Sequence, residues 1–156
     1  MKLKTPLMAL FLALATAIWA QQPQSKDQEL TVSDLVVQQV LEPLETGVQT
    51  QNIQMILGVF DKHDFAGYSN LQSNLRAFFQ VFNQADLRYR LLQVTAENGH
   101  GSAAVEMQMD ALPYEVTYIP VRRSVQMHLQ LKQGPKGWKI ADFTPADFFN
   151  VDYTPK

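Results

Sequence analysis

Hydrophobic residues recur at helical spacing through residues 30–82, which predicts a helical first half of the chain. The first helix is expected to begin at Thr31, whose side chain can form a capping box with Asp34, or at Ser33 alone. Its inner face is formed by Val37, Val40, Leu41, Leu44 and Val48. Pro43 lies inside this pattern and lacks the amide hydrogen of the helical ladder, so we expect a kink or an end there.

Two further helices are predicted before residue 84. The shorter one starts at Asn52 as N-cap, and the longer one starts at Ser69, which is spaced for a capping box with Gln72. The longer helix has the clearer apolar stripe, made of Leu71, Leu75, Phe78, Phe79 and Phe82.

After Gln84 the hydrophobic period changes to two, which is typical of β-strands. The predicted strands are residues 87–97, 102–110, 121–132 and 138–143. Glycine-rich turns at residues 98–101 and 134–137 are typical of hairpins between antiparallel neighbours. Residues 144–147 (Thr-Pro-Ala-Asp) are predicted to form a capped helical turn.

Three helices followed by four antiparallel strands predict an α+β domain in which the helices cover one face of a curved sheet. We place this domain at residues 30–150, with a tail at 151–156.

The first 20 residues have the layout of a secretory signal peptide. Lys2 and Lys4 precede an apolar run at residues 7–18, and Ala20 provides a small residue for cleavage. The run is shorter than the roughly 20 residues that span a bilayer, so no stable membrane anchor is expected after cleavage. Residues 21–29 are polar and are predicted to be a disordered lead-in. The sequence thus predicts an exported protein, periplasmic or secreted.

Composition excludes several function classes. The net charge of −2 is unlike the strong basic excess of a general nucleic-acid binder. The chain contains no cysteine, which excludes disulfides, thiolate zinc sites, iron–sulfur clusters and a cysteine nucleophile. We expect no cofactor and no metal.

Three segments in this order carry a family resemblance: Phe60-Asp61, Leu75-Arg76-Ala77-Phe78-Phe79, and residues 137–143 (Gly-Trp-Lys-Ile-Ala-Asp-Phe). Together they resemble the nuclear transport factor 2-like superfamily, and most closely its exported bacterial members of unassigned role. The resemblance covers about residues 30–150. It implies a cone in which a strongly bent sheet wraps the long helix and leaves a cavity at the wide end. Because the superfamily includes isomerases, cyclases, dehydratases and non-catalytic binding modules, the fold does not decide the function.

The resemblance also allows a test for catalytic residues. An isomerase of this superfamily uses a tyrosine and a neutral aspartic acid as donors, and their positions fall near Val40 and Met127 here. The link at residues 61–68 is too short for the inserted strand pair that normally carries the carboxylate base. A cyclase-like His–Asp site has one local candidate, Asp61-Lys62-His63-Asp64 beside Tyr68, although a solvated loop is the favoured interpretation. We therefore assign no catalytic residue.

The inward phase of the strands predicts a ligand-binding lining or, alternatively, a filled core. The pocket candidates are Phe60, Tyr68, Phe79, Met107, Met109, Arg123, Met127, Trp138 and Asp142. Arg123 shares the inward phase and could clamp an anionic ligand or pair with Asp142; the alternative is a strand end in water.

The outward phase is polar, and outer-face dimers are common in the superfamily, so a homodimer through this face is one expectation and a solvated sheet the other. The favoured function is a non-catalytic binding domain for a small apolar or amphipathic ligand, or for a protein partner. The alternatives are a small cavity enzyme of the cyclase, dehydratase or isomerase type, and a scaffold with a filled cone.

Overall fold

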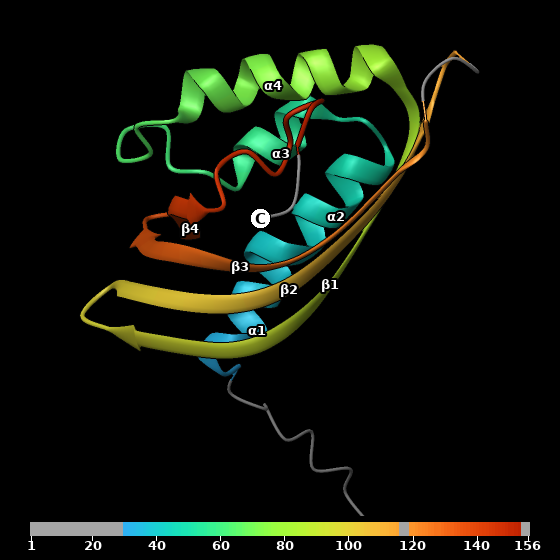
Figure 1. The fold of residues 1–156 in the computed structure, drawn as a ribbon. Coiled ribbons are helices and arrows are strands. Elements are labelled where there is room, and N and C mark those ends of the chain that lie inside the picture. Colours follow the sequence, from blue (N-terminus) through green and yellow to red (C-terminus); the bar gives the residue numbers. More distant parts are fainter. Residues whose placement is uncertain (1–29, 116–118, 154–156) are drawn as a thin grey trace, which may run out of the picture.

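A computed structural model describes residues 30–115 and 119–153, and places helices on one face of a curved sheet (Figure 1). The predicted signal peptide and lead-in, and residues 154–156 of the tail, lie outside the described residues. The helices are α1 (Val32–Val36), η1 (Val37–Leu41), α2 (Glu42–Gln49), α3 (Ile53–Gly58) and α4 (Tyr68–Val81). The strands are β1 (Phe82–Glu97), β2 (His100–Pro113), β3 (Val121–Gly134) and β4 (Gly137–Thr144). All neighbours are antiparallel in the order β1-β2-β3-β4, which confirms the α+β prediction.

The first helix is one continuous run from α1 through η1 to α2. The capping box is confirmed, since the Thr31 hydroxyl accepts from the Asp34 amide (3.2 Å) and the Asp34 carboxylate accepts from the Thr31 amide (2.9 Å). The helix does not end at Pro43. Instead, the turn before it is π-helical, and α-helical structure resumes with Pro43 in the first turn of α2. The wider turn lets the chain pass a residue that has no amide hydrogen to donate.

The other two helices differ in how well their starts were predicted. Asn52 caps α3 by accepting from the Met55 amide at 3.1 Å, as predicted. The capping box at Ser69 is wrong, because the N-cap of α4 is Gly67, two residues earlier, and no side chain caps the helix. A Cβ atom at Gly67 would lie 2.7 Å from the Phe65 ring. The Phe65 ring therefore packs closely against the backbone of Gly67, at the N-cap of α4.

The strands extend beyond their alternating hydrophobic runs. β1 starts at Phe82, directly after α4, and continues to a two-residue turn at Asn98 and Gly99. Both turn residues have positive φ (51° and 78°), which is the conformation that an Asn-Gly hairpin turn requires. The predicted helical turn at residues 144–147 is wrong, since this segment is an irregular turn with a cis Thr144–Pro145 peptide bond.

After β4 the chain turns back toward the helices (dark red in Figure 1). The Asn74 side-chain amide on α4 donates to the Asn150 side-chain oxygen at 2.6 Å. Phe148 and Phe149 are 0% and 1% exposed and belong to the hydrophobic core. The segment after β4 therefore packs against the core, and Val151 beyond it is partly buried there.

Candidate functional site

The concave inner face of the sheet carries one charged side chain. Arg123 on β3 lies opposite Met109 on β2, and it is 1% exposed. Strict alternation along β3 puts it on the same face as Met127. Among the described residues, Arg123 is the one polar or charged residue that is buried. Of the two interpretations that the sequence left open for Arg123, the structure has the inward orientation and not the solvated strand end.

The guanidinium of Arg123 is held by the main chain that follows β4. Its Nη1 donates to the carbonyl oxygen of Phe148, and its Nη2 donates to those of Asn150 (2.7 Å) and Val151 (3.3 Å). The rings of Phe78 and Tyr153 lie 5.3 and 5.1 Å from Cζ. These distances are in the range of cation–π contacts.

Two features leave the charge of Arg123 incompletely matched. Its buried Nε atom has no hydrogen-bond partner, and its described hydrogen bonds all go to neutral carbonyl groups. Burial lowers the pKa of Arg123, while Tyr153, Asp147 and Asp152 nearby act in the opposite direction. Even so, an arginine stays protonated near neutral pH. The site is therefore a buried cation whose nearest partners carry no formal charge.

The other pocket candidates fall into three groups. Five are buried in the hydrophobic core: Phe60, Met107, Met109, Met127 and Trp138. Tyr68 and Phe79 are half-buried and pack against this core. Asp142 is exposed, and its carboxylate accepts from the neighbouring Phe143 amide at 2.8 Å. No ion pair joins Asp142 to Arg123 in the described parts of the chain, so the pairing suggested from the sequence is wrong.

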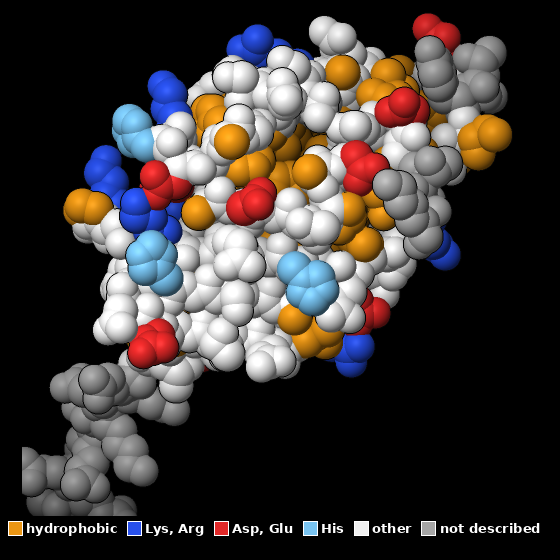
Figure 2. Space-filling view, turned by 60° about the vertical axis from the view of Figure 1, so that its left-hand side comes forward, with side chains coloured by type: hydrophobic (Ala, Val, Ile, Leu, Met, Phe, Trp, Pro, Cys, Tyr) orange, Lys and Arg blue, Asp and Glu red, His pale blue; other side chains and the backbone are white. Residues whose placement is uncertain are grey.

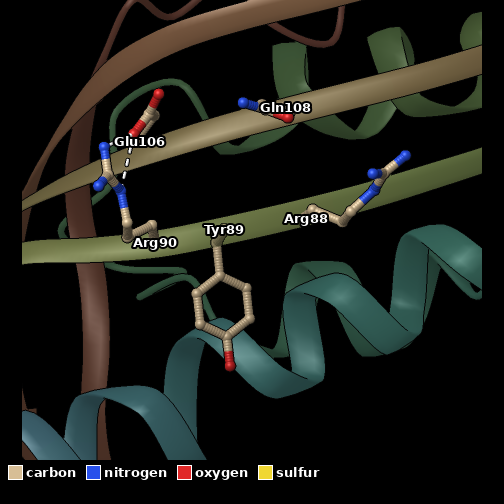
Figure 3. A pocket seen from close by; sticks show the side chains of 5 residues that line it. All are labelled: Arg88, Tyr89, Arg90, Glu106 and Gln108. Atoms are coloured by element: carbon tan, nitrogen blue, oxygen red, sulfur yellow. Dashed lines mark hydrogen bonds and ion pairs between the residues drawn. The ribbon is translucent and has the colours of Figure 1, made fainter.

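The outer face of the sheet is polar and shallowly hollowed. A hollow of about 290 Å³ is lined by Arg88, Arg90, Glu106 and Gln108, with Tyr89 at its edge (Figure 3). The Tyr89 ring points away from the two arginines, toward the helices (Figure 3). Burial, with smaller contributions from Glu42 and Glu45, raises the pKa of Tyr89.

The charges on this outer face pair with one another. Arg90 pairs with Glu106, and Asp110 bridges Arg88 (2.9 Å) and Arg122 (2.6 Å). The arginines of these pairs are 60–86% exposed, so each pair contributes little to stability. The face offers hydrogen-bonding groups rather than an apolar patch, and the homodimer stays a prediction.

The His–Asp candidate lies on the surface, on the loop between α3 and α4. The Asp61 carboxylate accepts from the amides of His63 (2.9 Å) and Asp64 (3.1 Å), and these bonds hold the pKa of Asp61 below its ordinary value. Asp64 pairs with Lys132 at the end of β3. His63 and Asp64 are exposed, as is Lys62 between them and Asp61. The cluster ties a loop to the sheet, which fits the solvated-loop interpretation; the described residues contain no group of three or more potential metal ligands.

The architecture is shared with solved structures. A nuclear transport factor 2-like superfamily protein from Salmonella enterica aligns with a TM-score of 0.59 and 12% identity, over 71% of this chain and 89% of that one. The chain has the nuclear transport factor 2-like fold. A conserved protein from Planctomyces limnophilus aligns with the same fold at a TM-score of 0.63 and 8% identity, over 71% of this chain and 92% of that one.

A third structure with this fold is named as an enzyme. It is a hexachlorocyclohexane dehydrochlorinase, LinA type 2, with a TM-score of 0.59 and 7% identity, over 71% of this chain and 82% of that one. No family model and no curated protein sequence matches this chain. At these identities the nuclear transport factor 2-like fold is shared while the activity is not transferred.

The two positions tested against the isomerase pattern are apolar and buried. Val40 on η1 is 0% exposed and Met127 on β3 is 1% exposed. Neither side chain can donate a hydrogen bond to a developing enolate oxygen.

Sequence reasoning missed the segment after β4 as part of this site. Its carbonyl groups bind Arg123, and two of its phenylalanines join the core. The adjacent Phe148 and Phe149 were the available signal, because two consecutive large apolar residues rarely both face water. Arg123 on β3 lies 25 residues before Phe148 in the sequence, so local spacing could not reveal the contact between them.

Proposed function

We propose that this protein is an exported, non-catalytic binding domain whose concave interior receives a small apolar or amphipathic molecule. The observation that carries this proposal is the chemistry of the interior. Apart from Arg123, the side chains buried among the described residues are hydrophobic. Such a surface can exclude water and contact a ligand, but it lacks a paired acid and base for proton transfer.

The make-up of the sheet's inner face supports binding over rigid packing. Met107, Met109 and Met127 occupy adjacent strands of this face. Methionine side chains are unbranched and polarisable, so they can repack around guests of different shape. The filled interior is then the ligand-free arrangement of an adaptable lining, and one buried cation would orient a polar end of the guest.

The enzyme alternative has less support from the residues. The dehydrochlorinase named above shares the fold only, and the Asp61–His63 loop here faces solvent. Turnover of a halogenated or unsaturated cyclic substrate that is lost in both Asp61→Asn and His63→Gln, but kept in His128→Gln, would establish this alternative. We expect no turnover in any of these proteins.

A matched pair of substitutions on β2 tests binding in the interior. Met107 is buried on the inner face, whereas the adjacent Gln108 is exposed on the outer face. Met107→Ala opens apolar space, and such space binds apolar guests in other proteins. We expect fluorescence titration with N-phenyl-1-naphthylamine to show tighter binding to Met107→Ala than to the wild type, and unchanged binding to Gln108→Ala. Equal affinity in all three proteins would contradict interior binding. Native mass spectrometry after gentle purification tests for a retained guest.

We also propose export, which the sequence of residues 1–20 supports. None of the helices in the described ranges 30–115 and 119–153 is long and apolar enough to cross a bilayer. Expression of the full chain in a bacterium, followed by fractionation and N-terminal sequencing, should yield a periplasmic or secreted protein beginning at Gln21. A cytoplasmic protein that keeps Met1 would contradict this proposal.

A further inference from the structure

We infer that Arg123 is a carboxylate-binding residue whose site is covered, in this structure, by the chain's own residues 151–153. The ligand class is a monocarboxylate with a compact apolar tail. This inference rests on the proposed function and adds the chemistry of the guest. It is carried by three features of the Arg123 environment: its unmatched charge, a guanidinium edge on which Nε has no partner, and the division of the covering segment into an anchored and a lightly held part.

The first feature is the unmatched charge. Arg123 is 1% exposed and donates to main-chain carbonyl groups of Phe148, Asn150 and Val151. A buried cation is stabilised far better by an anion, since charge-assisted hydrogen bonds are roughly twice as strong as neutral ones. The guanidinium is thus already removed from water, but no anion is hydrogen-bonded to it to offset the cost of that burial.

The second feature is the edge of the guanidinium formed by Nε and Nη2. Nε has no partner, and Nη2 is shared between the carbonyl oxygens of Asn150 (2.7 Å) and Val151 (3.3 Å). Two parallel N–H groups on one edge match the two oxygens of a carboxylate. Nη1 can keep its bond to the Phe148 carbonyl while this edge changes partners.

The third feature is the division of the covering segment into an anchored and a lightly held part. Phe148 and Phe149 are 0% and 1% exposed and pack edge to face at 5.1 Å. Beyond them, Val151 and Tyr153 are half-buried and Asp152 is exposed. Displacement of residues 151–153 by a ligand removes the Val151 carbonyl from Nη2. Nη2 carries two N–H groups, so one can stay on the Asn150 carbonyl, and the two phenylalanines stay in the core.

Charge and shape both suit this exchange. Asp152 is close enough to raise the pKa of Arg123 without bonding to it in the described structure, so its departure removes a negative charge that the ligand restores. The Tyr153 ring lies 6.0 Å from the Phe148 ring and 5.1 Å from Cζ of Arg123. An apolar tail about as large as the Tyr153 ring can take the place of that ring against Phe148.

The test compares 3-phenylpropionate with 3-phenylpropan-1-ol, which has the same skeleton and no charge. Calorimetric titrations use the wild type, Tyr153→Ala to loosen the cover, Arg123→Gln, and Arg122→Gln as the matched control. Arg122 directly precedes Arg123, and its 86% exposed side chain pairs with Asp110 on the outer face. We expect the acid to bind about 10- to 100-fold more tightly than the alcohol, because the acid adds charge-assisted hydrogen bonds. This preference should persist in Arg122→Gln and disappear in Arg123→Gln.

Tyr153→Ala should bind the acid more tightly than the wild type does. Because Arg123→Gln can fail to fold, the wild-type protein also provides a direct readout by nitrogen NMR of its arginine side chains. The buried Nε–H signal of Arg123 should shift on addition of the acid and stay in place with the alcohol.

Two results would overturn the inference, and they differ in their consequence for the proposed function. Equal binding of acid and alcohol, with no shift of the Nε–H signal, shows apolar binding alone and leaves the proposed function standing. Absence of binding by either compound to the wild type and to Tyr153→Ala also overturns the inference. In that case the proposed function fails as well if N-phenyl-1-naphthylamine does not bind Met107→Ala more tightly than the wild type.

Discussion

Phe148→Ala measures how firmly the segment after β4 belongs to the core. Phe148 is 0% exposed, and its ring packs against Phe149 at 5.1 Å and Tyr153 at 6.0 Å. Truncating a fully buried phenylalanine costs about 3–5 kcal/mol, since apolar burial is lost and a cavity remains. That is a large share of the roughly 5–15 kcal/mol that stabilises an ordinary domain. For a domain of about 120 residues, each kcal/mol corresponds to about 4 °C, so Tm should fall by about 12–20 °C.

Urea unfolding followed by tryptophan fluorescence gives the free energy of unfolding, and calorimetry gives Tm. Trp138 is buried in the same core, so its fluorescence changes when the core becomes exposed to water on unfolding. Tyr114→Ala is the control, because Tyr114 is 59% exposed and its removal should change stability by less than about 0.5 kcal/mol. A loss below about 1 kcal/mol for Phe148→Ala would refute the reasoning, since it would mean that the segment is not packed as described.

Two further predictions concern the hairpin and the α3–α4 loop. Gly99→Ala should destabilise the protein by about 1 kcal/mol, because Gly99 has φ of +78°. Gly58→Ala should be neutral or slightly stabilising; at both positions the added methyl group meets no other atom, so only the backbone conformation differs. Equal effects of the two substitutions in urea unfolding would contradict this. The lowered pKa of Asp61 stabilises the fold above the ordinary value of 3.8, and this contribution is lost as the pH falls through the lower folded value. Asp61→Asn should therefore show a weaker loss of stability on acidification than the wild type in urea titrations between about pH 2 and 5; identical pH profiles would count against it.

Local pattern was sufficient for much of the fold. The helical and strand periods located three helices and four strands, and Asn52 and Thr31 were identified as caps. A cap depends on a residue and its neighbour three positions away, so it can be read from the sequence. Alternation along β3 also oriented Arg123 inward, because successive side chains of a strand face opposite sides.

Predictions failed at two places where the chain departs from the conformation that its residue types favour. α4 starts before Ser69, next to the close contact between Gly67 and the Phe65 ring. The helix passes Pro43 because a π-helical turn precedes it within one continuous run. In both places the conformation departs from what the neighbouring residue types favour, so propensity alone was a poor guide.

The sequence by itself determined the order of the elements and the apolar inner face, and it offered an inward Arg123 as one of two interpretations. Only the tertiary structure decided what that cation meets. The partners of Arg123 lie 25 to 28 residues further along the chain, at the end of a segment with no regular period. Periodicity assigns a side chain to a face, whereas a hydrogen bond across the core depends on how the whole chain closes around it.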